Sequence, residues 1–167
     1  MAGVSAKILE LAGKIRLLIM DVDGVLTDGQ VYYGVGGEVA KAFYVRDGIG
    51  IKEVLKCGIG VAVISGRYSA GTKERLMELG VQHIYLGIKD KVACFTELQQ
   101  QLQVSVEQVA YIGDDVPDLA MIQLVGLGVA VADAVQEVKA VARYVTKAIG
   151  GRGAVRELCD LIRQAQS

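Results

Sequence analysis

The sequence predicts an α/β fold built on a mostly parallel sheet. Short runs rich in valine and isoleucine alternate along the chain with segments of helical periodicity, which is typical of βαβ units. Apolar residues make up 52% of the 167 residues, which is ample material for a buried core. Because this length lies within the usual range of one domain, we expect a single domain over residues 1–167.

The expected strands are short, apolar runs. They span residues 15–22, 30–33, 39–44, 59–65, 83–86, 109–113, 127–131 and 144–145. The second and third are β-branched and aromatic, and the stretch Gly34-Val35-Gly36-Gly37 separates them. Since glycines supply the positive φ angles of tight turns, these two runs predict a β-hairpin inserted after the first strand.

The expected helices follow the strands and show helical spacing of apolar residues. They span residues 49–56, 68–79, 89–102, 116–124, 134–142 and 154–164. Pro117 lies in the first turn of one of them, where its missing N–H costs little. Asp133 precedes another and is expected to cap it.

Composition excludes several classes of partner. The formal net charge is −1, with 18 basic and 19 acidic residues, so no charge excess favours nucleic acid or an anionic membrane surface. No apolar run approaches the length of a membrane span, and residues 1–11 lack the apolar core of a signal peptide. The three cysteines have no metal-binding spacing, and we expect a reduced, cytoplasmic setting.

The most informative motif is a pair of carboxylates at the end of the first strand. Residues 17–28 read Leu-Leu-Ile-Met-Asp-Val-Asp-Gly-Val-Leu-Thr-Asp, so a buried strand delivers Asp21 and Asp23 to its carboxyl end, where open α/β sheets bind ligands. Two adjacent acids favour a hard cation such as magnesium. Gly24 follows the second acid and allows the chain to leave the strand there.

Polar clusters follow three further strands of the predicted sheet. They are Ser65-Gly66-Arg67, Lys89-Asp90-Lys91, and the group of Asp114, Asp115 and Asp118. Each has an ordinary alternative, because serine and aspartate cap helices and most lysines are simply exposed. Four clusters at equivalent positions of four successive strands nevertheless favour one shared site.

The combined residues suit phosphoryl transfer. Asp21, Asp114 and the backbone carbonyl of Asp23 would hold magnesium, while Lys91 and the metal would neutralise phosphate charge. Ser65 would donate a hydrogen bond to a phosphate oxygen. Asp21 would attack phosphorus, and Asp23 would protonate the leaving alkoxide and then deprotonate the water.

These residues resemble the four ordered motifs of the haloacid dehalogenase superfamily of phosphatases. The matching segments are Asp21-Val22-Asp23-Gly24, Ser65, Lys91 and Gly113-Asp114-Asp115-Val116-Pro117-Asp118. The resemblance implies a Rossmann-like three-layer sandwich and an aspartyl-phosphate intermediate. It also implies that Ser65, Gly66 and Lys91 bind phosphate and that Asp115 and Asp118 support the metal ligands.

A closer resemblance extends over nearly the whole chain. Residues 21–29, 45–50, 65–67 and 150–157 are similar to the family of 3-deoxy-D-manno-octulosonate 8-phosphate phosphatases. This similarity implies a magnesium-dependent, cytoplasmic, capless phosphatase of lipopolysaccharide biosynthesis that assembles as a homotetramer. A related nine-carbon sugar acid phosphate is an alternative substrate, and a non-catalytic scaffold domain is an alternative function, although the intact set of acids argues against it.

The chain has too few residues between its motifs for a cap domain. Only the predicted hairpin separates Asp23 from Asp47, so we expect a neighbouring subunit to cover the site, with the hairpin at the interface. The alternative is that the hairpin packs on its own subunit.

Substrate recognition needs partners for the carboxylate and hydroxyl groups of a sugar acid. Arg67 is the first candidate, because it follows Ser65-Gly66 and arginine binds carboxylates bidentately. Arg46, Arg75 and Thr27 are secondary candidates, and Arg46 could equally pair with Asp47.

Overall fold

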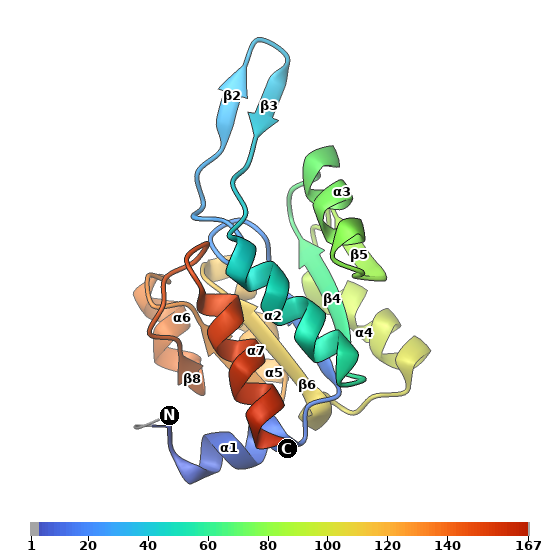
Figure 1. Ribbon diagram of the computed structural model, residues 1–167, viewed down its shortest axis with the longest axis vertical. Helices are drawn as coiled ribbons and strands as arrows, with labels where there is room; N and C mark the ends of the chain where they lie inside the picture. Colours follow the sequence, from blue (N-terminus) through green and yellow to red (C-terminus); the bar gives the residue numbers. More distant parts are fainter. Residues whose placement is uncertain (1–3, 167) are drawn as a thin grey trace.

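A computed structural model describes residues 4–166 and has the expected α/β architecture (Figure 1). Six parallel strands form one sheet in the order β5-β4-β1-β6-β7-β8. Their bounds are β1 Leu17–Met20, β4 Gly60–Ser65, β5 His83–Leu86, β6 Val109–Gly113, β7 Leu127–Ala130 and β8 Tyr144–Val145. The predicted fold class is therefore confirmed.

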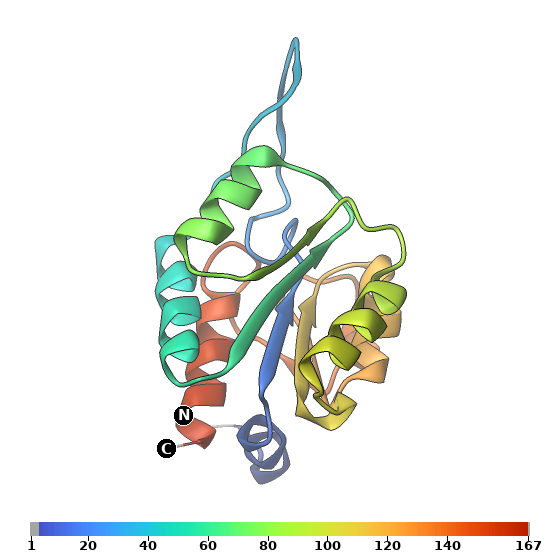
Figure 2. The ribbon, with the colours of Figure 1, turned by 90° about the vertical axis from the view of Figure 1, so that its right-hand side faces the viewer.

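Helices cover both faces of the sheet and complete a three-layer sandwich (Figure 2). Their bounds are α1 Ala6–Gly13, α2 Val45–Lys56, α3 Ala70–Glu78, α4 Lys91–Leu102, α5 Leu119–Leu124, α6 Gln136–Val141 and α7 Ala154–Ala165. The helices α2 and α7 pack together on one face, while α4, α5 and α6 lie on the other. Because both faces are covered, every residue of β1, β6 and β7 is buried.

Several boundaries differ from the sequence prediction. The strand β1 ends at Met20, because the carbonyl of Val22 accepts hydrogen bonds from three N–H groups of residues 25–27 and starts a turn. The helix α2 starts four residues earlier than expected, at Val45. The segment 116–124 divides into a 3₁₀ turn, Val116–Asp118, and α5, and the sequence did not indicate α1.

The inserted hairpin is present and stands away from the rest of the fold (Figures 1 and 2). Its strands, β2 (Tyr32–Gly34) and β3 (Gly37–Ala40), form a separate two-stranded antiparallel sheet. Its apolar side chains Tyr32, Tyr33 and Val39 are exposed. An isolated two-stranded hairpin is at best marginally stable in water, so these side chains are available to another surface.

The central strand β1 lies at the point where the strand order reverses. Its neighbours are β4 on one side and β6 on the other. The strand β5 lies beyond β4, and β7 and β8 lie beyond β6. In open parallel sheets, ligands bind beyond the carboxyl ends of the strands at this position. Within residues 4–166, no helix is both long and apolar enough to cross a membrane.

A glycine-rich segment before α7 fixes the loop that follows β1. A Cβ atom on Gly150 would lie 1.8 Å from the carbonyl oxygen of Gly24, so a larger residue does not fit without movement. The N–H of Gly150 donates to Asp133 at 2.9 Å. Asp133 therefore holds this segment rather than capping the next helix, which starts at Gln136 and receives no side-chain cap.

We predict that Gly150→Ala lowers the free energy of unfolding by about 1–3 kcal/mol, because the added methyl group overpacks the contact with Gly24. The matched control is Gly71→Ala in α3, where nothing lies within 4 Å of the added Cβ. This control is expected to gain stability by up to about 1 kcal/mol, since alanine favours a helix over glycine. Denaturant unfolding measures both, and an unchanged Gly150→Ala protein would contradict the tight contact.

Candidate active site

A cavity of about 500 Å³ opens at the carboxyl ends of β1, β4 and β6. Nine of the predicted site residues line it: Asp21, Asp23, Ser65, Gly66, Arg67, Lys91, Asp114, Asp115 and Asp118. Gly24, Gly29 and Pro117 complete the lining. The four polar clusters of the sequence therefore meet at one site, as the alternation of strands and helices predicted.

Lys91 is the centre of the charged groups in this cavity. Its side chain is only 6% exposed, and its Nζ donates to Asp21 and to Asp118, each at 2.7 Å. Burial by itself lowers the pKa of an ammonium group, but the two carboxylates outweigh burial and raise the pKa of Lys91 above its ordinary value. Lys91 is therefore a fixed positive charge and not the exposed surface lysine of the alternative interpretation.

Asp118 uses both carboxylate oxygens to hold its neighbours. Its Oδ1 accepts from the hydroxyl of Tyr111 at 2.5 Å as well as from Lys91. Its Oδ2 accepts from the backbone N–H groups of Asp114 at 2.9 Å and Asp115 at 3.3 Å. Because both carboxylate oxygens accept hydrogen bonds, Asp118 is suited to hold these neighbours in place.

Three carboxylates crowd the floor of the cavity. Asp21, Asp114 and Asp118 each place an oxygen within 4.8 Å of the others. Burial, followed by the charges of Asp118 and Asp21, raises the pKa of Asp114 to about 8. Burial and Asp118 also raise the pKa of Asp21. Carboxylate oxygens are the hard ligands that magnesium prefers, and Lys91 supplies only one positive charge to the three acids, so the cluster fits that cation.

Gly24 allows this crowding because it has no side chain. It adopts a φ of +81°, and a Cβ there would lie 2.0 Å from Oδ2 of Asp114. Gly24 thus lies in the turn that follows β1, and its lack of a side chain leaves room for Asp114. Asp115, in contrast, is exposed and accepts a hydrogen bond from the N–H of Val116 at 2.7 Å.

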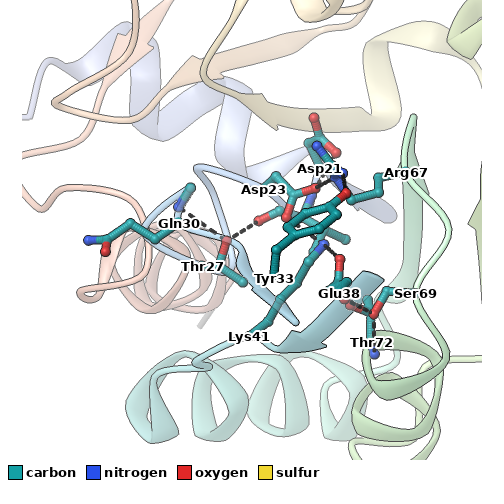
Figure 3. Close-up of polar contacts among 12 residues, drawn as sticks. Asp21, Asp23, Thr27, Gln30, Tyr33, Glu38, Lys41, Arg67, Ser69 and Thr72 are labelled. Atoms are coloured by element: carbon teal, nitrogen blue, oxygen red, sulfur yellow. Dashed lines mark hydrogen bonds and ion pairs between the residues drawn. The ribbon is translucent and has the colours of Figure 1, made fainter. Parts of the chain in front are cut away.

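Asp23 lies between two cations (Figure 3). Its Oδ1 is 2.6 Å from Nζ of Lys41, and its Oδ2 accepts from Nε of Arg67 at 3.2 Å. Arg67 also donates to the hydroxyl of Tyr33 at 3.2 Å, so the hairpin contacts the cavity through two side chains. Ser65, buried at the end of β4, and Gly66 line the same cavity.

The three secondary substrate candidates do not line this cavity. Thr27 is fully buried, and its hydroxyl donates to the carbonyl of Val22 and accepts from the N–H of Gly29. The guanidinium of Arg46 lies 6.0 Å from the ring centre of Tyr44. Arg75 pairs with Glu78 on α3 and lines a neighbouring cavity beside the hairpin.

Sequence reasoning missed Tyr111 and Lys41. Tyr111 lies in an apolar strand, so its periodicity marks it only as a core residue, although its hydroxyl contacts Asp118 and Lys91. Lys41 lies at the base of the hairpin, where a charged side chain is ordinarily exposed. A pattern of spacing carries no signal that this lysine folds back to Asp23.

Comparison with known proteins agrees with this geometry. The profile of the haloacid dehalogenase-like hydrolases matches residues 87–157. A 3-deoxy-D-manno-octulosonate 8-phosphate phosphatase of Escherichia coli K12 is 50% identical over 163 residues, which cover 98% of this chain and 87% of that protein.

Solved structures give the same relationship. The crystal structure of a 3-deoxy-D-manno-octulosonate 8-phosphate phosphatase from Yersinia pestis is 50% identical with a TM-score of 0.96, covering 98% of this chain and 88% of that one. That of the Moraxella catarrhalis phosphatase, in complex with magnesium, phosphate and 3-deoxy-D-manno-octulosonate (KDO), is 43% identical with a TM-score of 0.95, covering 98% and 94%. The chain therefore belongs to the family of 3-deoxy-D-manno-octulosonate 8-phosphate phosphatases within the haloacid dehalogenase superfamily.

Proposed function

We propose that this protein hydrolyses 3-deoxy-D-manno-octulosonate 8-phosphate to the free sugar acid and phosphate, with Asp21 as the nucleophile. The observation that carries this proposal is the position of Asp21, which lies in the cavity beside Lys91 and within the carboxylate cluster. The similarity to phosphatases of this specificity over nearly the whole chain supports the choice of substrate.

In the proposed mechanism, an oxygen of Asp21 forms a bond to phosphorus while the bond from phosphorus to the sugar oxygen breaks. Asp23 gives its proton to the leaving alkoxide and later takes one from the water that releases phosphate from Asp21. Lys91 stabilises the negative charge that the phosphoryl group carries, and Ser65 and Gly66 line the same cavity as candidate phosphate donors.

Magnesium, held by Asp21, Asp114 and the backbone carbonyl of Asp23, would neutralise phosphate charge as a Lewis acid. Asp118 would keep the loop of Asp114 in place through the two backbone N–H bonds that it accepts. Asp115 is proposed to contribute negative charge near this loop without a direct contact to the metal.

Arg67 is the proposed partner for the carboxylate of the sugar acid. Its side chain is 46% exposed and lines the cavity, so it can turn toward a ligand. A guanidinium binds a carboxylate with two parallel hydrogen bonds, which suits a substrate that carries both a phosphate and a carboxylate. We further propose that the reaction belongs to lipopolysaccharide biosynthesis in the cytoplasm, and that residues 1–167 act as one domain.

We also propose that the protein is a homotetramer with the hairpin at the subunit interface. The chain has no inserted cap domain in residues 4–166, and Tyr32, Tyr33 and Val39 are 55%, 68% and 65% exposed. A neighbouring subunit would bury these side chains and cover the cavity.

Light scattering is expected to give four times the mass of the chain for the natural sequence. We predict that Val39→Glu on the hairpin gives a smaller species with lower phosphatase activity, because a charge is costly to bury in an interface. Leu9→Glu on α1 places the same charge on a surface distant from the hairpin and serves as the control. A fully active monomer of the natural sequence would refute the assembly.

We predict that Asp21→Asn abolishes phosphate release, because an amide oxygen is a poor nucleophile for phosphorus. The expected loss is at least about a thousandfold, comparable to the removal of other catalytic nucleophiles. Phosphate release from 3-deoxy-D-manno-octulosonate 8-phosphate, assayed with magnesium, measures it. Asp160→Asn, a change of a half-buried carboxylate on α7 that pairs with Arg156 and Arg163 outside the cavity, is the control for charge. Full activity in Asp21→Asn would exclude the mechanism.

A further inference from the structure

We propose that Lys41, at the base of the hairpin, is a positioning residue for proton transfer by Asp23. Lys41 holds one carboxylate oxygen of Asp23, so that the other oxygen can exchange a proton with the substrate. This inference rests on the proposed role of Asp23 as the general acid and base. It assigns to the hairpin a part in the chemistry of its own subunit, beyond any part in assembly.

The two oxygens of Asp23 have different surroundings (Figure 3). Oδ1 is buried and lies 2.6 Å from Nζ of Lys41, a side chain that is only 3% exposed. Oδ2 contacts Arg67, whose side chain is 46% exposed and therefore has room to move when a ligand arrives. Oδ1 is thus tied to a fixed cation, whereas Oδ2 is the atom that can exchange a proton with the leaving group or with water.

Lys41 is itself held from the other side. Its Nζ lies 3.4 Å from Oε2 of Glu38, and Oε1 of Glu38 accepts a hydrogen bond from the hydroxyl of Ser69 at 2.5 Å. The same serine oxygen accepts from the N–H of Thr72 and caps α3. A continuous series of contacts therefore runs from the start of α3 through the base of the hairpin to Asp23.

These contacts explain why a lysine is buried at the base of an otherwise exposed hairpin. Burying an ammonium group is costly unless carboxylates accompany it, and Lys41 has two: Glu38 from the preceding strand β3 and Asp23 from the loop after β1. The cost is offset only while the hairpin lies against the cavity. The position of the hairpin and the orientation of Asp23 are consequently coupled.

The experiment separates orientation of Asp23 from general damage by changing the leaving group. A sugar or simple alkyl alkoxide needs a proton as it leaves, whereas p-nitrophenolate is stable without one. In Lys41→Met, single-turnover cleavage of an alkyl phosphate is expected to fall on the order of ten- to a hundredfold, which is no more than the lower end of a general acid's usual contribution, because Asp23 itself is kept. The first burst of p-nitrophenolate from p-nitrophenyl phosphate should change by less than about threefold.

Lys52→Met, an exposed change on α2, is the matched control and is expected to leave both rates unchanged. Glu38→Gln is the second variant: it keeps Lys41 but removes one of its carboxylate partners, and it should give a smaller loss with the same preference for the alkyl ester. Circular dichroism and thermal unfolding test whether each variant is folded. If Lys41→Met does not fold, the comparison of the two esters in Glu38→Gln tests the proposal.

An equal fall with both esters, or no change with either, would overturn the proposal for Lys41. Asp21→Asn is measured beside these variants with the same esters. If it loses activity while the Lys41 variants show no dependence on the leaving group, only the role of Lys41 fails. If Asp21→Asn retains activity, the proposed function itself fails, independently of Lys41.

Discussion

The mutual repulsion of carboxylates around one buried lysine is the constraint on which the rest of the site depends. Asp21, Asp114 and Asp118 converge within 4.8 Å, and Lys91 supplies one positive charge to Asp21 and Asp118. One cation does not balance three acids at this depth, and burial, followed by the charges of Asp118 and Asp21, raises the pKa of Asp114. A divalent cation would neutralise the remaining negative charge. The cation and Lys91 would then present positive charge to a phosphate group.

The surrounding fold holds this unfavourable arrangement in place. Gly24 lets Asp114 approach the loop after β1, and the glycine-rich segment before α7 fixes that loop from the outside. Tyr111 and two backbone N–H groups fix Asp118, so the acids cannot move apart to relieve their repulsion. Asp47 links α2 to the start of α7, because its carboxylate accepts hydrogen bonds from the N–H groups of Gly153 and Arg156. The repulsion among the carboxylates is unfavourable, and the packing of the surrounding loops offsets it.

Much of this organisation could be predicted because it depends on local pattern. The parallel sheet follows from alternating apolar runs, and the meeting of Asp21, Ser65, Lys91 and Asp114 follows from their positions after successive strands. The contacts of Lys41 and Tyr111 depend on how the hairpin and β6 pack, which spacing along the chain does not encode. The same limit applies to Thr27, Arg46 and Arg75, which lie outside the cavity lining and have partners within their own loops or helices.

Calorimetric titration of the metal-free protein with magnesium, in buffers that differ in protonation enthalpy, tests this balance of charge most directly. With the pKa of Asp114 at about 8, the metal-free site holds a proton near pH 7 that metal binding must displace. Magnesium affinity should therefore rise with pH up to about 8, with about one proton released per ion near pH 7 and fewer above pH 8. Asp114→Asn should abolish that release, and tight binding without proton release near pH 7 would contradict the crowded, cation-deficient site.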